Sequence, residues 1–174
     1  MRTLWIFTGI SLLILTSFKN VSHSTSNRKS SALRGHNTPI DFTLMDSANK
    51  PVTLSQFRGK FVVIAMEANW CRPCMGEVEA TKTLQADLLG QNIVWIFVSF
   101  DRDKESWDDA RHANNFKGIQ VWGKPKSEDL KKIFSFDSLP YYVWVDRNGV
   151  IVVDDAPRPS SRSTIKQLRM YLNG

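Results

Sequence analysis

The sequence predicts an α/β fold with a mixed β-sheet, and three observations carry this expectation. Two continuous apolar runs, at 60–66 and 93–98, are typical of central strands that are covered on both faces. Between them, from Cys74 onward, apolar or small residues recur at helical spacing. Near the C-terminus, apolar runs at 141–145 and 150–153 bracket an Asn-Gly pair, which favours an antiparallel hairpin. Strands that alternate with helices and end in an antiparallel pair indicate such a sheet.

The remaining elements follow from local patterns. Apolar segments at 42–45 and 51–54 flank a polar stretch, which predicts a hairpin near the start of the domain. Residues 106–116 are helix-like but weakly patterned. A serine followed by two acidic residues predicts a capped helix over 127–134. Leucine and isoleucine at helical spacing predict a closing helix over 165–172.

Composition and charge narrow the class of protein. The chain has 174 residues, of which 42% are hydrophobic and 23% charged, as in an ordinary globular domain. The formal net charge is +6, but five of the 23 basic residues lie before position 37, where no acidic residue occurs. The rest of the chain holds 18 basic and 17 acidic residues. Such a domain lacks the basic surface that a phosphate backbone requires, so no nucleic-acid partner is expected.

The N-terminus has the pattern of an export signal. Arg2 precedes residues 4–18, which carry no charge, and small polar residues follow them. We expect residues 1–24 to be a secretory signal peptide or an uncleaved membrane anchor, 25–36 a polar linker, and 37–174 the folded domain. The domain is therefore expected outside the cytoplasm, periplasmic or otherwise extracytoplasmic, and either secreted or tethered to the membrane.

The two cysteines of the chain, Cys71 and Cys74, follow a predicted buried strand and open a predicted helix. At a helix N-terminus, unpaired N–H groups and the helix dipole favour a thiolate and lower a thiol pKa from about 8.5 to between about 3.5 and 7.5. Pro73 suits the first helical turn because it has no N–H, and Arg72 adds a nearby cation. We therefore expect Cys71 to attack a substrate disulfide and Cys74 to resolve the resulting mixed disulfide.

Two other interpretations of this pair stay open at this point. Cysteines at this spacing can be half of a zinc site, but the site would need two further ligands, and the chain has no other cysteine and three histidines. The second alternative is a pair of buried, unreactive cysteines. Neither is favoured, and neither a metal nor another cofactor is expected.

Five segments in the same order resemble the thioredoxin superfamily, and more narrowly the exported TlpA/ResA-type thiol–disulfide oxidoreductases, which overlap the redoxin family in pattern. The resemblance covers nearly all of residues 37–174. The segments are P-I-D-F-T-L at 39–44, L-S-Q-F-R-G-K at 54–60, W-C-R-P-C at 70–74, F-S-F-D-S-L-P at 134–140 and V-D-R-N-G at 145–149.

The resemblance implies a thioredoxin-like fold, with an N-terminal hairpin, that reduces or exchanges disulfides of exported proteins. It implies a cis peptide bond between Leu139 and Pro140, opposite the cysteines, where the backbone could pair with a substrate strand. Trp70, beside Cys71, is expected to form a partly exposed platform for the substrate. The implied partners are a disulfide-containing exported protein and a membrane thiol reductant that donates electrons.

Two glutamates are further candidates. Glu77 lies three residues after Cys74, and the resemblance implies that a glutamate there takes part in proton transfer; a solvated first-turn glutamate is an equal alternative. Glu67 stands where the family more often has an aromatic residue, and it could tune the thiols together with Arg72 and Pro73. We favour the interpretation that Glu67 reaches solvent. Glu79 replaces a proline common in the family, so the usual helix kink is expected to be missing.

Two rival functions share this fold class. A peroxiredoxin-like thiol peroxidase would have a threonine three residues before the reactive cysteine, where this chain has Ala68. A copper-binding chaperone would use more widely spaced cysteines and a downstream histidine, and no histidine follows His112.

Overall fold

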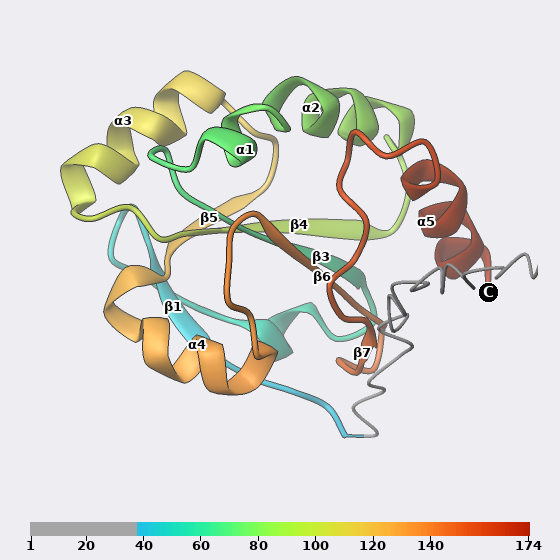
Figure 1. Ribbon diagram of the computed structural model, residues 1–174. Helices are drawn as coiled ribbons and strands as arrows, with labels where there is room; N and C mark the ends of the chain where they lie inside the picture. The colour runs from blue at the N-terminus through green and yellow to red at the C-terminus, as the bar shows by residue number, and fades with distance from the viewer. Residues whose placement is uncertain (1–37) are drawn as a thin grey trace, which may run out of the picture. The chain divides into compact units, whose positions relative to one another are not determined.

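The structure is a computed structural model that describes residues 38–174. A seven-stranded sheet with the order β2-β1-β5-β4-β3-β6-β7 forms its centre, and helices cover both faces (Figure 1). The strands are β1 (Thr43–Asp46), β2 (Pro51–Thr53), β3 (Phe61–Glu67), β4 (Ile93–Ser99), β5 (Ile119–Trp122), β6 (Tyr141–Val145) and β7 (Ile151–Val153). The α-helices are α1 (Arg72–Met75), α2 (Val78–Asp87), α3 (Lys104–Asn114), α4 (Ser127–Phe134) and α5 (Thr164–Asn173), and the short 3₁₀ helices are η1 (Leu54–Phe57) and η2 (Lys124–Lys126). The expected thioredoxin-like α/β architecture is confirmed.

Strand β3 lies inside the sheet, between β4 and β6, and is buried along almost its whole length. It pairs in parallel with β4 over seven residues and antiparallel with β6 over five. Because side chains of a strand alternate between its two faces, β3 contributes to two separate cores. Ile64 and Met66 belong to the core under α4, with Leu130 and Phe134.

The second core lies on the opposite face of the sheet, under α2 and α5. It contains Val63 and Ala65 of β3, Leu84 of α2 and Leu168 of α5. Trp144, fully buried on β6, belongs to it, as expected for a core tryptophan. The continuous apolar character of β3 and β4 therefore reflects a sheet that is covered on both sides.

Most expected elements occur where the sequence placed them, with two differences. Strand β5 was not predicted, because its four residues follow Gly118 and are too short to give a clear apolar run. The helix after Cys71 is divided into α1 and α2 at Gly76 and Glu77, so the expectation that Glu79 would leave the helix unbroken is wrong. The break needs no proline, because the Glu77 N–H bonds to the Cys74 carbonyl in 3₁₀ fashion.

The proposed signal peptide or anchor at 1–24 and the linker at 25–36 lie outside the described residues. Among residues 38–174, no helix combines the length and the apolar character that crossing a bilayer demands.

The register of the sheet brings the ends of four strands to one edge. Met66, near the end of β3, is opposite Tyr141, the first residue of β6, so the loop before β6 lies beside the turn after β3. Ser99, the last residue of β4, is opposite Trp122, the last residue of β5. The segments that follow β3, β4 and β5 and the segment that precedes β6 therefore meet at this edge.

Candidate functional site

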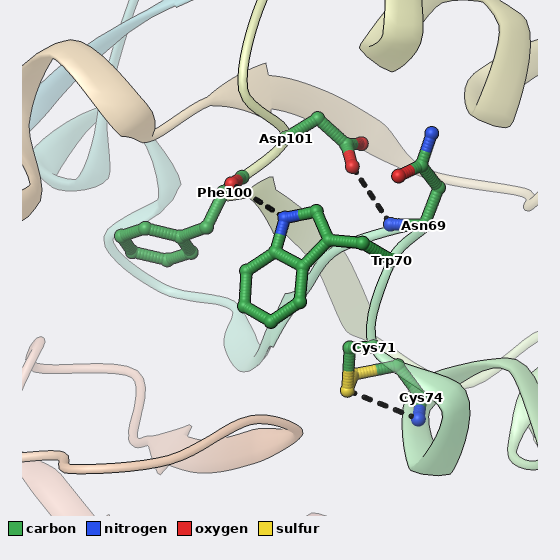
Figure 2. The surroundings of a disulfide bond; sticks show 6 residues. All are labelled: Asn69, Trp70, Cys71, Cys74, Phe100 and Asp101. Carbon is green, nitrogen blue, oxygen red and sulfur yellow. Dashed lines mark hydrogen bonds between the residues drawn. A yellow bond between two sulfur atoms is a disulfide. The ribbon is translucent and has the colours of Figure 1, made fainter.

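The two cysteines lie at this edge and form a disulfide. Their sulfur atoms are 2.08 Å apart, and their Cα atoms 5.2 Å. A turn after β3, in which the Cys71 N–H donates to the Ala68 carbonyl at 3.1 Å, leads into α1. Cys71 is the N-cap of α1, and its sulfur accepts a hydrogen bond from the Cys74 N–H at 3.2 Å (Figure 2). This contact would favour a negative charge on the Cys71 sulfur in the reduced protein.

The residues between the cysteines fit the first turn of a helix. Pro73 occupies an early helical position whose N–H would have no intrahelical partner, so the missing donor costs nothing. Arg72 is exposed, and its side chain lines the surface beside Cys71. Both residues therefore lie where the sequence placed them.

A groove of about 560 Å³ opens beside Cys71. Apolar side chains of Phe100, Phe136 and Leu139 line it, and the rim carries charges of both signs. The charged residues that line it are Arg72, Lys124, Glu128, Lys131 and Asp137. Cys71 lines this groove whereas Cys74, at 2% exposure, does not, so a substrate in the groove would meet Cys71 first.

The expected substrate-binding residues are found around this groove. Trp70 lines it and is 56% exposed, in agreement with a platform beside Cys71. Leu139 is half-buried and also lines it, and the Leu139-Pro140 peptide bond is cis, as the resemblance implied. Pro140 itself is buried and does not line the groove.

The turn that carries Trp70 is fixed by the chain just after β4. The Asn69 N–H donates to Asp101 Oδ1 at 2.7 Å, and the Trp70 indole Nε1–H donates to the Phe100 carbonyl at 3.3 Å (Figure 2). Asp101 is 1% exposed. The sequence analysis did not select Asp101. The available signal was its place as an acidic residue just after a predicted buried strand, β4, which ends beside the cysteines.

Glu77 is buried, at 7% exposure, so the alternative of a solvated first-turn glutamate is wrong. Its carboxylate accepts two hydrogen bonds from Ser160, one from the backbone N–H at 2.9 Å and one from the hydroxyl at 2.8 Å. The Glu77 N–H in turn donates to the Cys74 carbonyl at 2.9 Å. Glu77 therefore connects the junction between α1 and α2 to the segment before α5.

Glu67 does not extend freely into solvent, which corrects the interpretation we favoured. Its side chain is partly buried at the end of β3. Burial raises the pKa of Glu67 to about 8, and the nearby charge of Asp101 adds to the rise. The pKa of Tyr142 is also raised, first by burial and then by the charges of Glu67 and Glu77.

No group of three or more His, Cys, Asp or Glu side chains within residues 38–174 is arranged to hold a metal ion.

The raised pKa of Glu67 predicts a pH dependence of stability. Glu67 holds its proton up to about pH 8 in the folded protein, against an ordinary pKa of 4.5, so folding takes up a proton between these values. The oxidised protein should lose stability as pH rises from about 5 to 8. Glu67→Gln removes this loss, and its melting temperature should exceed that of the wild type by about 5 °C at pH 8 and by little at pH 4.5.

Thermal unfolding of the oxidised proteins over pH 4.5–8.5 tests this expectation. Glu79→Gln is the matched control, because Glu79 is exposed and only pairs with Lys82 on the surface. If the melting temperatures of Glu67→Gln and the wild type differ by the same amount at every pH, the fold does not raise the pKa of Glu67.

Comparison with known proteins agrees with this geometry. The chain is 28% identical to the thioredoxin-like protein YneN of Bacillus subtilis, covering 82% of this chain and 84% of that protein. It is 23% identical to the thiol-disulfide oxidoreductase ResA of Geobacillus kaustophilus, covering 83% and 82%. A crystal structure from Bacteroides vulgatus, provisionally named a thiol-disulfide oxidoreductase, matches with a TM-score of 0.73 at 28% identity, over 82% of this chain and 99% of that one.

Other curated relatives are matched over a smaller share of their length: 18% of a probable nucleoredoxin of Arabidopsis thaliana and 51% of a Haemophilus influenzae protein. The model of the AhpC/TSA family matches residues 35–153, well over half of the chain. The matched segment includes the cysteine pair, the cis-proline loop and all seven strands of the sheet. The chain therefore belongs to the AhpC/TSA family, a redoxin family of the thioredoxin superfamily.

Proposed function

We propose that the protein is a thiol–disulfide oxidoreductase that uses Cys71 and Cys74 to reduce or exchange disulfides of exported proteins. The observation that carries this proposal is the Cys71–Cys74 disulfide at the start of α1, with Cys71 beside a groove. A two-residue spacing lets the same pair exist as a dithiol or as a disulfide without rearranging the sheet. The names of the relatives with matching length support the same activity.

The reaction follows from the positions of the two sulfurs. In the reduced protein the Cys71 thiolate attacks one sulfur of the substrate disulfide, and the other substrate sulfur leaves as a thiolate that takes up a proton. Cys74 then loses its proton and attacks the Cys71 sulfur, which releases the second substrate thiol. The substrate gains two electrons, and the protein is left with the disulfide seen in the structure. A thiol donor, proposed to be a membrane reductant, would return the two electrons.

The residues around the groove have distinct proposed roles. Trp70 and Leu139 would contact the substrate, and the backbone before Pro140 would pair with an extended substrate strand. The helix N-terminus and Arg72 would stabilise the Cys71 thiolate, with Pro73 shaping the first turn. Glu67 would change the charge behind the cysteines when it titrates near pH 8.

A thiol peroxidase is the second candidate, because the matching family model is that of the AhpC/TSA proteins. Against it stands Ala68, where the peroxiredoxin pattern has a hydroxyl-bearing threonine that would contact the peroxide. Hydrogen peroxide therefore serves as the comparison substrate in the assays below.

Removal of Cys74 should trap the substrate. In Cys74→Ser the first step still forms a mixed disulfide on Cys71, but no second thiol is present to resolve it. We expect a stable covalent adduct with a disulfide-containing protein such as insulin, detected by mass spectrometry and reversed by a thiol reductant. Cys71→Ser is the control and should give no adduct.

An adduct on Cys74 in Cys71→Ser, at a rate equal to that of Cys71 in Cys74→Ser, would contradict the assignment of the two cysteines. Turnover of hydrogen peroxide by the wild type at a higher rate than insulin reduction would favour the peroxidase.

Glu77 should assist the second step by accepting the proton of Cys74. Glu77→Gln keeps the shape and a partner for the Ser160 hydroxyl but removes the base. We expect resolution of the mixed disulfide to slow by about tenfold, the low end of the range for general bases, with its pH profile altered. Rapid-mixing measurements of adduct decay provide the rate.

Ser160→Ala is the matched control, because it removes the hydroxyl contact and retains the carboxylate. Equal slowing in Glu77→Gln and Ser160→Ala, without a change in the pH profile, would make Glu77 a structural link between α2 and the C-terminal segment.

Export is proposed from the pattern of residues 1–24, either as a signal peptide or as a tether. A reporter enzyme that is active only outside the cytoplasm, fused after Gly174, should be active, and deletion of residues 4–18 should silence it. Equal activity of both fusions would contradict export through this segment.

A further inference from the structure

We propose that Asp101 is a positioning residue for disulfide exchange, because it fixes the Asn69–Trp70 turn so that Trp70 forms a wall of the groove beside Cys71. The inference rests on the proposed function and deepens it, since it names a residue outside the Cys-x-x-Cys segment that sets the shape of the substrate site.

Both oxygens of the buried Asp101 carboxylate accept a hydrogen bond. Oδ1 accepts from the Asn69 N–H at 2.7 Å, and Oδ2 accepts from the Ser99 hydroxyl at 2.8 Å. The Asp101 N–H donates to the same Ser99 oxygen at 3.0 Å, which fixes the carboxylate relative to the end of β4. Hydrogen bonds from an N–H to a carboxylate are stronger than those to a neutral oxygen, so the Asn69 backbone is closely bound to β4.

The neighbouring contacts fix the same turn from both sides. The Trp70 indole donates to the Phe100 carbonyl at 3.3 Å (Figure 2). The Asn69 side-chain amide donates to the Ser106 carbonyl at 3.2 Å. The Trp122 indole donates to the Asp101 carbonyl at 3.2 Å, which fixes Asp101 in turn. Only Trp70 separates Asn69 from Cys71, so a shift of the Asn69 backbone would move the indole relative to the cysteine.

The attacking cysteine has supports of its own. The Cys71 N–H bonds to the Ala68 carbonyl and its sulfur accepts from the Cys74 N–H. Loss of the Asp101 contact should therefore displace the Trp70 wall more than it displaces Cys71. This difference predicts separate effects on a protein substrate, which needs the groove, and on a small reagent, which needs only the sulfur.

Hydrogen bonds alone hold the buried carboxylate of Asp101, because no salt bridge involves this residue among the described residues. The partly buried carboxyl of Glu67 lies close enough for the charge of Asp101 to help raise the pKa of Glu67, and at neutral pH that group is mainly protonated.

Three variants of the purified protein test the proposal. Asp101→Ala removes both acceptors, whereas Asp101→Asn keeps an oxygen for the Asn69 N–H. Asp103→Asn is the matched control, because it makes the same chemical change two residues away, where the carboxylate caps α3 at Ser106 and Asn caps equally well. The measurements are kcat/KM for insulin, the alkylation rate of reduced Cys71 by iodoacetamide, and the NMR signals of the Asn69 amide and the Trp70 indole.

We expect Asp101→Ala to lower kcat/KM for insulin by about tenfold, mainly through KM, while the Cys71 alkylation rate changes less than about twofold. Its Asn69 amide should exchange faster and its Trp70 indole signal should shift. Asp101→Asn should give a smaller defect, with KM and Asn69 exchange between those of the wild type and of Asp101→Ala, and Asp103→Asn should match the wild type.

A folded Asp101→Ala protein with wild-type insulin kinetics or an unshifted Trp70 signal overturns the proposal. So does an equal loss of alkylation rate and insulin reduction, which would mean general damage to the site. If Asp101→Ala does not fold, Asp101→Asn decides, since it should still accelerate Asn69 exchange and raise KM. An inactive wild type would contradict the proposed function instead, and the Asn69 and Trp70 signals would still show whether Asp101 fixes the turn.

Discussion

The pairing of β3 with β4 on one side and β6 on the other is the constraint on which the site depends. Parallel pairing with β4 places the segments that follow both strands at the same edge of the sheet, and antiparallel pairing with β6 places the loop before β6 there as well. A shift of one residue in either register would turn the side chains of β3 to the wrong core. The two separate cores under α4 and under α2 and α5 therefore fix the register, and the register fixes which loops surround the cysteines.

Contacts between residues far apart in the sequence then give the edge its detailed shape. The Asn69 to Asp101 hydrogen bond joins the turn after β3 to the turn after β4. The two hydrogen bonds from Ser160 to Glu77 join the start of α2 to the segment before α5, across 83 residues. In each of these contacts the donor and the carboxylate oxygen both have a hydrogen-bond partner. Such contacts favour one arrangement of the loops, because any other would leave a buried donor or carboxylate without a partner.

The contrast between strands with local sequence patterns and contacts between distant residues explains how far the sequence could predict the site. Apolar runs and the Asn-Gly turn predicted β3, β4, β6 and β7 because burial on both faces and hairpin geometry leave local patterns. The cysteine pair was predicted from its place between a strand and a helix, whereas the cis bond before Pro140 came only from the family resemblance. The partners of Glu77 and Asn69 could not be predicted, because nothing near either residue in the sequence indicates Ser160 or Asp101. The environment of Glu67 was misjudged for a related reason: its burial depends on neighbours from other strands and helices.

The same geometry gives the two cysteines unequal environments. Cys71 caps α1, lines the groove and has the exposed Arg72 beside it, and each of these features favours an attacking thiolate. Both cysteines lie in the same buried core, with Met66 and Ala68, but only Cys71 lines the groove. In the proposed mechanism, a Cys74 thiol that stays neutral until the mixed disulfide forms would not compete with Cys71 for the substrate. It would then need a group that takes its proton at the second step, and we propose Glu77 for this role because it follows Cys74 by three residues and Ser160 fixes its buried carboxylate.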